Sequence, residues 1–185
     1  MTQESESIAV TAADPNAQRS ALKTLLEEYH AWLASEAREW AAEQESTTAA
    51  LPEEEYDPAT EAVEDRETLA DPDADVQEFL AFFKGDATGV VLLYGVSGEM
   101  AELKRLYVRP AYREHGIGRA LCRAAIEAAG EQGYGTVGLT TPPWSEGAHT
   151  LYEDLEFGYT DPYPETKLPA HLHENALFMQ RELSS

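Results

Sequence analysis

Hydrophobic residues in the first part of the chain recur at the spacing of a helix. Between residues 16 and 44 the large apolar side chains lie mostly three or four positions apart, which places them on one helix face. This stripe consists of Leu22, Leu25, Leu26, Tyr29, Trp32, Leu33 and Trp40. Asp14 and Pro15 precede it, and an acidic N-cap followed by proline favours a helix start there. Residues 7–11 alternate like a short strand. We therefore expect a strand and then a long helix that packs on another element.

From residue 76 onward the pattern changes to that of strands. Three segments rich in aliphatic and aromatic residues follow one another, at 76–84, 88–96 and 100–108. They predict an antiparallel meander whose first turn is Gly85-Asp86. Leu103 and Leu106 lie three positions apart and cannot both face one core in a flat strand of period two. A bulge is therefore expected within 104–107, and Pro110 ends the pairing.

Helices and strands alternate in the second half of the chain. Gly116 opens a helix with one apolar stripe, formed by Ile117, Leu121, Ala125 and Ala128. Gly130 and Gly133 close this helix. The remaining elements are expected to be a strand at 136–141, a helix at 147–155 with Ser145 as its N-cap, and strands at 157–161 and 176–183.

The segment 46–75 between the long helix and the meander has a different composition. It is acidic, contains three prolines and has few large apolar residues. This predicts a mobile loop with one short helix near 59–69.

The overall charge excludes some of the functions that a chain of this size could have. The 185 residues include 35 acids and 13 bases, for a net charge of −22, which excludes a nucleic-acid binder that relies on phosphate neutralisation. The longest apolar stretch, 89–96, is far shorter than the ~20 residues that span a bilayer, and acids stand where a signal peptide needs bases. We expect one soluble, cytoplasmic domain over 1–185. The excess of acids predicts a halophilic host and stability that rises with salt.

One window of the chain is basic against this acidic background. Residues 1–80 carry 21 acids and 4 bases, whereas 104–123 carry six bases and the single acid Glu114. The bases are Lys104, Arg105, Arg109, Arg113, Arg119 and Arg123. One interpretation is an ordinary solvated strand and helix face. The other is an anion site kept positive, which the glycines of the same window favour.

Two glycines stand where the strand of this window leads into the helix. Helix-start N–H groups have no intrahelical partner and the helix dipole is positive there, so this end attracts anions. Gly116 and Gly118 lack the Cβ atoms that would keep a diphosphate from the backbone. A glycine pair at a helix start can also serve a tight turn alone, so the surrounding sequence has to decide.

Two stretches of the chain resemble the signatures of the GNAT superfamily of acyl-CoA-dependent N-acyltransferases. Arg113-Glu114-His115-Gly116-Ile117-Gly118, after Val108-Arg109-Pro110, is similar to the family's Arg/Gln-x-x-Gly-x-Gly/Ala. The stretch from Ala148 through Leu151-Tyr152 to Glu156-Phe157 resembles Ala-x-x-Leu-Tyr-x-x-x-Gly-Phe, with glutamate in place of the glycine. The resemblance covers most of the chain except about 46–75.

The resemblance implies a fold and a cofactor site. The expected fold is α/β, a mixed, mostly antiparallel twisted sheet flanked by helices and splayed centrally for acetyl-CoA. The pyrophosphate is expected on the backbone amides of Arg113, Glu114, His115, Gly116, Ile117, Gly118 and Arg119. Pantetheine is expected to add like a strand beside Tyr107 and Val108. The side chains of Arg113 and Arg119 either meet the phosphates or are solvated.

The resemblance also implies two catalytic residues. Acyl transfer needs an uncharged acceptor nitrogen and a thiolate that is stabilised or protonated as it leaves. Tyr152 resembles the tyrosine that donates a proton to the departing sulfur, and its alternative is a helix tyrosine packed on the sheet. Glu102 stands where several members carry a general base that acts through water, and its alternative is an exposed strand carboxylate.

Other reactive residues are assigned no role in the chemistry. Cys122 lies within an apolar helix and is interpreted as a small core residue rather than a nucleophile. His171 and His173 alternate in a loop expected to border the acceptor site, but a metal needs a third ligand, and we predict no metal site.

The sequence leaves the acceptor open. The expected activity is transfer of an acetyl or short acyl group from acetyl-CoA to a small amine, amino acid or peptide through a ternary complex, with no membrane and no nucleic acid involved. The rivals are a non-catalytic acyl-CoA-binding regulatory module and an interaction protein that uses segment 46–75. The oligomeric state is not set, and a homodimer stays open.

Overall fold

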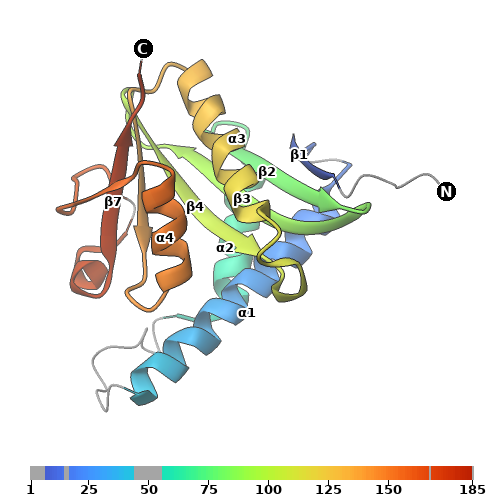
Figure 1. Cartoon of the computed structure of the whole chain (residues 1–185), viewed down its shortest axis with the longest axis horizontal. Coiled ribbons are helices and arrows are strands. Elements are labelled where there is room, and N and C mark those ends of the chain that lie inside the picture. The colour runs from blue at the N-terminus through green and yellow to red at the C-terminus, as the bar shows by residue number, and fades with distance from the viewer. Residues whose placement is uncertain (1–6, 15–16, 44–55, 167, 185) are drawn as a thin grey trace.

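A computed structural model describes residues 7–14, 17–43, 56–166 and 168–184. The helices are α1 (Arg19–Glu43), α2 (Pro58–Ala70), α3 (Ile117–Glu131) and α4 (Glu146–Asp154), with short 3-10 turns at Pro110–Tyr112 and Ala170–Asn175. The strands are β1 (Ile8–Ala12), β2 (Val76–Phe83), β3 (Asp86–Gly95), β4 (Met100–Val108), β5 (Thr136–Thr141), β6 (Gly158–Thr160) and β7 (Leu177–Glu182) (Figure 1).

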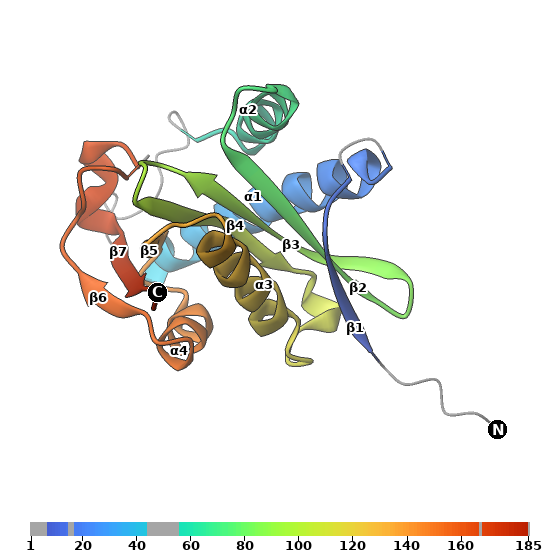
Figure 2. The ribbon, with the colours of Figure 1, turned by 90° about the horizontal axis from the view of Figure 1, so that it is seen from above.

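The strands form one sheet in the order β1-β2-β3-β4-β5-β7-β6. Every neighbouring pair is antiparallel except β4 and β5, which are parallel. Figure 2 shows α1 and α2 on one face of this sheet, with α3 and α4 on the other. The expected mixed, mostly antiparallel sheet flanked by helices is confirmed.

Alternation along the strands gives each face of the sheet its own core. Phe79, Ala81 and Phe83 of β2 join the cluster under α3 and α4, whereas Leu80 joins the cluster under α1. The α1 stripe buries Leu22, Leu25 and Leu26 on that second face. The sequence period of two therefore places two helical layers on opposite sides of one sheet.

The predicted bulge in β4 is present and has the expected effect on the side chains. The register with β3 shifts between Val90 and Leu92, and Arg105 adopts a positive φ of 57°. The extra residue lets Leu103 and Leu106 both contact the core under α3.

The short helix predicted in the acidic segment is α2. Asp57 accepts a hydrogen bond from the Thr60 amide at 3.0 Å, and Pro58 follows this cap at the first helical position. The predicted mobile loop falls partly on 44–55, which lies outside the described residues.

Several local predictions need small corrections. Asp14 accepts a hydrogen bond from the Ala17 amide in a turn that precedes α1, so it does not cap α1 itself. The β2–β3 turn is centred on Lys84 and Gly85, both at positive φ, rather than on Gly85-Asp86. Ser145 is the residue before α4, but its side chain makes no capping hydrogen bond. Among the described helices, none has the length and apolarity needed to cross a membrane.

Candidate active site

The centre of the sheet opens where β4 and β5 part. Their parallel pairing runs from Met100–Thr136 to Leu103–Leu139, after which β5 continues along β7 and β4 continues along β3. The last residues of β4, 104–108, thus form a free edge on the β5 side. A free edge offers backbone N–H and C=O groups to an extended ligand. Tyr107 and Val108, predicted to lie beside pantetheine, are on this edge.

The start of α3 lies just beyond the free edge. Gly116 is the N-cap, and the first intrahelical hydrogen bond runs from the Ala120 amide to the Gly116 carbonyl at 3.0 Å. The N–H groups of Ile117, Gly118 and Arg119 precede that bond and point out of the helix end. The result is a row of donors with a positive helix dipole behind it, which suits an anionic group.

The two glycines of the motif serve different structural needs. Gly116 has a φ of +79°, and a Cβ added there meets no atom within 4 Å, so its backbone conformation calls for glycine. A Cβ at Gly118 lies 3.3 Å from the Leu151 side chain of α4, so this glycine allows close packing of α3 on α4.

The basic side chains around this helix end already have partners. Arg113 donates to the Val108 carbonyl at 3.0 Å, and its guanidinium lies 4.9 Å from the Trp32 ring. Arg119 pairs with Asp154 of α4. The ring of His115 hydrogen-bonds the Arg113 carbonyl at 2.8 Å. Backbone amides rather than these side chains therefore dominate the helix end.

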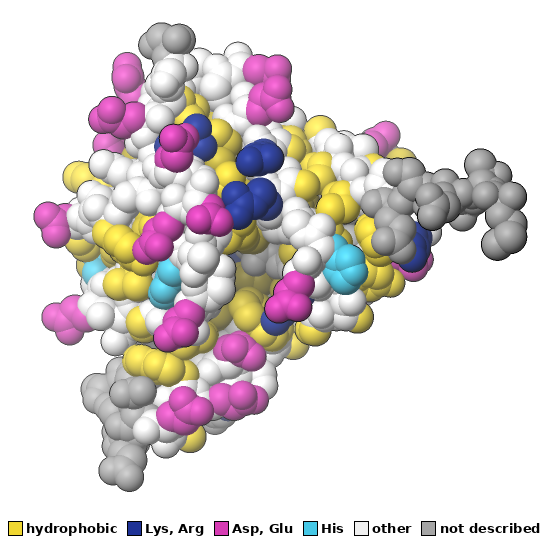
Figure 3. Space-filling model, viewed as in Figure 1, with side chains coloured by type: hydrophobic (Ala, Val, Ile, Leu, Met, Phe, Trp, Pro, Cys, Tyr) yellow, Lys and Arg dark blue, Asp and Glu magenta, His cyan; other side chains and the backbone are white. Residues whose placement is uncertain are grey.

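The surface is hollowed between α4 and the segment that enters α3. Figure 3 shows this hollow with hydrophobic side chains around it and Lys or Arg side chains over α3 beside it. A hollow with hydrophobic side chains around it, next to a free strand edge and a helix end rich in N–H donors, suits the two parts of coenzyme A, the amide-containing pantetheine arm and the diphosphate. The free edge and the helix end together fit this cofactor.

Tyr152 of α4 lies in the core under α3. Its side chain is 7% exposed and its ring makes an edge contact with Phe157 at 6.0 Å. Burial raises the pKa of Tyr152 well above its ordinary value, and the nearby Cys122 and Tyr29 add to this. The hydroxyl therefore keeps its proton near neutral pH, and the contacts of the ring are those of a helix tyrosine packed on the sheet.

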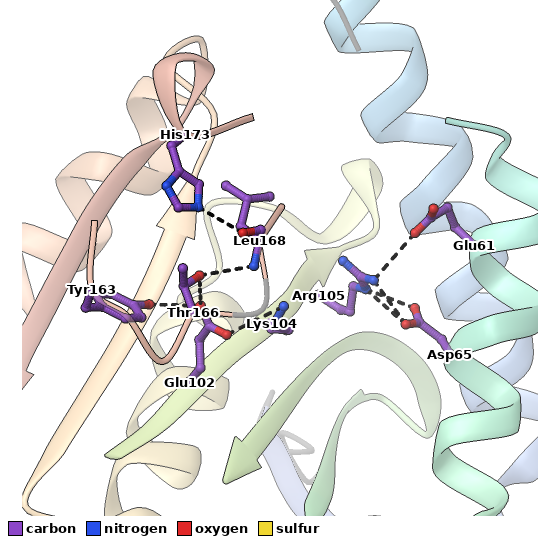
Figure 4. Close-up of polar contacts among 9 residues, drawn as sticks. All are labelled: Glu61, Asp65, Glu102, Lys104, Arg105, Tyr163, Thr166, Leu168 and His173. Carbon is purple, nitrogen blue, oxygen red and sulfur yellow. Dashed lines mark hydrogen bonds and ion pairs between the residues drawn. The ribbon is translucent and has the colours of Figure 1, made fainter. Parts of the chain in front are cut away.

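Glu102 lies on the other face of β4 and is fully buried. Its Oε1 accepts hydrogen bonds from the Tyr163 hydroxyl at 2.8 Å and the Thr166 hydroxyl at 3.2 Å (Figure 4). Its Oε2 is buried, has no hydrogen bond among the described residues and lies 3.5 Å from Lys104 Nζ. The interpretation of Glu102 as an exposed strand carboxylate is wrong, because the segment after β6 covers it.

The partners of Glu102 come from the loop between β6 and β7. The Leu168 amide donates to the Thr166 hydroxyl at 3.2 Å, and the His173 ring hydrogen-bonds the Leu168 carbonyl at 2.9 Å (Figure 4). Sequence reasoning missed Tyr163 and Thr166, since no spacing relates them to β4. His173 thus supports this loop, and the side chain of His171 lies outside what the structure describes.

Lys104 shares the face of Glu102 on β4. Burial lowers the pKa of Lys104 and the neighbouring Arg105 lowers it further, while Glu102 opposes both effects. Its Nζ also lies 5.9 Å from the Tyr94 ring. Sequence reasoning counted Lys104 only as one member of the basic window.

A second polar cluster fixes the bulge to α1 and α2. Arg105 makes a two-pronged ion pair with Asp65, whose carboxylate also hydrogen-bonds His30 at 2.7 Å, and His30 contacts the Tyr56 hydroxyl at 2.5 Å. Burial alone would raise the pKa of Asp65, but its hydrogen bonds with His30 and Arg105 lower it overall. Glu61 lies 3.8 Å from Arg105 (Figure 4). This cluster was not predicted.

The cysteine behaves as its place in an apolar helix predicts. Cys122 is fully buried, and burial raises the pKa of its thiol to about 12, which makes it unreactive as a nucleophile at neutral pH. No group of three or more metal-binding side chains occurs in the described ranges.

Comparison with known proteins identifies the family. Residues 34–159, more than half of the chain, match the model of the acetyltransferase (GNAT) family, so the chain belongs to this family. An uncharacterized N-acetyltransferase of Schizosaccharomyces pombe is 33% identical over 101 residues, which cover 54% of this chain and 59% of that protein. The N-acetylaspartate synthetase of Xenopus tropicalis is 31% identical over 105 residues, 55% of this chain and 39% of the relative. The chain thus spans about half the length of the curated relatives it matches.

Solved structures agree on the fold. A GNAT-family acetyltransferase of Staphylococcus aureus superposes with a TM-score of 0.68 at 18% identity, covering 96% of this chain and 100% of that one. The PaiA N-acetyltransferase of Thermoplasma acidophilum in complex with coenzyme A gives 0.62 at 19% identity, with 96% and 99% covered. At this identity the likeness concerns the fold alone.

Proposed function

We propose that this protein is an N-acetyltransferase that moves an acetyl or short acyl group from acetyl-CoA to a primary amine. The observation that carries the proposal is the free β4 edge with the α3 helix end beside it, in a chain of the GNAT family. Two solved structures of this fold hold the cofactor. The PaiA enzyme is in complex with coenzyme A, and the YncA protein of Salmonella typhimurium is in complex with acetyl-CoA. The site offers this ligand an edge for its amide groups and a donor row for its diphosphate.

The diphosphate would be held by the helix end. The amides of Gly116, Ile117, Gly118 and Arg119 are the proposed donors, preceded by those of Glu114 and His115, whereas the Arg113 amide already donates to the Pro110 carbonyl at 3.3 Å. The guanidinium groups of Arg113 and Arg119 give a positive rim, although each would have to share its present partner. Pantetheine would lie along Tyr107 and Val108, with its thioester toward the point where β4 leaves β5.

The proposed reaction would use one side chain from each face of the sheet. The acceptor amine, in its uncharged form, attacks the thioester carbonyl and passes a proton to Glu102, directly or through water. Tyr152 donates its proton to the sulfur as the C–S bond breaks. Oε1 of Glu102 is held by Tyr163 and Thr166, so Oε2, which is buried and has no hydrogen bond among the described residues, is the oxygen that would take the proton.

The acceptor is proposed to be an amine on a small molecule. Two relatives are named for N-acetylation at amino acids, an N-acetylaspartate synthetase and a thialysine N-epsilon-acetyltransferase.

A panel of amines, amino acids, polyamines and short peptides, assayed for release of the CoA thiol, tests the proposal. We expect release with at least one class and none without protein. Acetyl-CoA binding without release for any class would favour the non-catalytic binding module instead.

A further inference from the structure

Lys104 lies where the free edge of β4 begins, beside the proposed proton acceptor Glu102. It is the first β4 residue after pairing with β5 ends at Leu103. It shares the strand face of Glu102, and its Nζ lies 3.5 Å from Glu102 Oε2, an oxygen without a hydrogen bond in the described part of the chain (Figure 4). Its side chain is 18% exposed, so it is not sealed in the core. A nucleophilic nitrogen and a proton acceptor are therefore adjacent at the free edge.

The surroundings of Lys104 favour the nucleophilic form of its amine. Attack on a thioester needs an unprotonated nitrogen. Burial lowers the pKa of Lys104 and the guanidinium of Arg105 lowers it further, and together they outweigh the opposite effect of the Glu102 and Asp65 carboxylates. Arg105 itself is held by Asp65 and cannot move away to relieve this repulsion without breaking that ion pair.

We propose that Lys104 is an internal acetyl acceptor, to which the protein transfers an acetyl group from acetyl-CoA when no external amine occupies the site. The proposal rests on the proposed acetyltransferase function. The Nζ lone pair attacks the thioester carbonyl carbon, so that a C–N bond forms and the C–S bond breaks. The proton lost by Nζ goes to Glu102, and the thiolate leaves and is protonated to the CoA thiol. The products are Nε-acetyl-Lys104 and free CoA, and no oxidant or reductant is needed.

Acetylation of Lys104 would change the acceptor face in two ways. It removes the positive charge beside Glu102 and adds an acetyl group at the free edge. We therefore expect the acetylated protein to turn over external amines more slowly than the unmodified protein, with a burst of CoA release limited to one equivalent when no amine is added.

The chain has few lysines, so acetylation can be measured at each one separately. The chain contains four, Lys23, Lys84, Lys104 and Lys167. The full chain is incubated with acetyl-CoA alone, and each lysine is then examined by peptide mass spectrometry. Trypsin does not cleave after an acetylated lysine, so modification of Lys104 shifts the cut from Lys104 to Arg105. Exposed Lys23 reports non-enzymatic acetylation, and excess CoA added as a competitor reports dependence on the cofactor site.

We expect acetylation at Lys104 to exceed that at Lys23 at least tenfold, to fall in Glu102→Gln, and to be suppressed by excess CoA. Lys104→Arg should abolish the single-equivalent burst, and its melting curve checks that the variant is folded. An unmodified Lys104 in protein that acetylates an external amine would overturn this inference and leave the proposed function intact. Equal labelling of Lys104 and Lys23, insensitive to CoA, would also overturn it. If the protein acetylates neither Lys104 nor any external amine, both this inference and the proposed function are contradicted.

Discussion

Tyr152 and Glu102 lie on opposite faces of the sheet. Leu103 faces the core under α3, and so the neighbouring Glu102 faces the side of α1 and α2. Tyr152 belongs to the core under α3. In the proposed reaction Glu102 would accept a proton on one face and Tyr152 would donate one on the other, so that the acceptor and the leaving thiolate lie on different sides of the carbonyl. Their variants should accordingly fail in different ways.

Tyr152→Phe tests the proton donor. The ring keeps its packing and only the hydroxyl is lost, so CoA affinity should change little. Turnover should fall by ~10²-fold, the lower end of what a positioned acid supplies, because thiolate is already a good leaving group. Steady-state kinetics and CoA titration measure both quantities. The control is Tyr159→Phe, since Tyr159 is exposed on β6. Equal turnover in wild type and Tyr152→Phe would leave Tyr152 as a packing residue.

Glu102→Gln tests the proton acceptor. The Gln amide oxygen can still accept from Tyr163 and Thr166, so the loop should stay in place while the base is lost. Turnover should drop most near neutral pH and recover as pH rises, because more of the acceptor is then free base. The measurement is the pH dependence of kcat/KM. Glu78→Gln is a matched control, a buried carboxylate on β2. A profile parallel to wild type at equal stability would rule out the base role.

At the level of helices and strands, the site depends on how α3 begins and on the bulge in β4. The α3 start depends on one glycine at positive φ, and the β4 bulge depends on ion pairs from α2. The bulge itself could be predicted from Leu103 and Leu106, since a period-two strand cannot face both inward. The ion pair that fixes the bulge to Asp65 could not be predicted from the sequence. An acidic helix face is usually solvated, and nothing in the local pattern of α2 marks one carboxylate as buried.

Gly116→Val tests the helix end. Valine at positive φ costs ~1–2 kcal/mol of backbone strain, and its side chain would project into the space in front of the α3 amides, so CoA affinity should drop sharply. Gly133→Val provides the matched control, since Gly133 also has a positive φ of 88° and open space around it, at the opposite end of α3. Isothermal titration of CoA compares the two variants. Equal affinities would show that Gly116 serves only the turn.

Asp65→Asn tests the anchor of the bulge. Because its pKa is lowered in the folded state, Asp65 contributes stability that is present above the unfolded-state pKa of about 4 and is lost as the pH falls through the lower folded value. We expect the variant to lose about 1–3 kcal/mol near pH 7, allowing for the partial exposure of Arg105. The gap to wild type should shrink below about pH 4. Urea unfolding over a pH series measures it.

Two outcomes would separate this from general destabilisation. Glu61→Gln should cost less, since Glu61 lies farther from Arg105. A gap between wild type and Asp65→Asn that stays constant from neutral to acidic pH would mean that the charge of Asp65 contributes nothing to stability.

The whole molecule has a large net negative charge, but its basic residues are concentrated in the window 104–123. The basic window predicted from sequence falls on the free edge and on α3, but several of its members are already paired with acids, with Arg109 bound to Glu28 and Arg119 to Asp154. Sequence could locate this window because it is contiguous. It could not assign the pairs, which join residues as far as 81 positions apart.

Stability should rise with salt. A chain of net charge −22 repels itself, and the Debye length falls from ~10 Å at 0.1 M to ~3 Å at 1 M salt. We therefore expect the melting temperature to increase steadily from low salt to molar KCl. A thermal shift series measures this. A melting temperature that is flat or falls over that range would contradict an adaptation of this surface to high salt.

The free edge of β4 and the start of α3 together form the proposed acyl-CoA site, which would present the thioester to Glu102. A crystal structure of the protein grown with acetyl-CoA tests this arrangement. We expect pantetheine along Tyr107 and Val108, the diphosphate on the amides of Gly116 to Arg119, and the acetyl group between Tyr152 and Glu102. Acetyl-CoA bound elsewhere, or bound here with its acetyl group directed away from both residues, would contradict it.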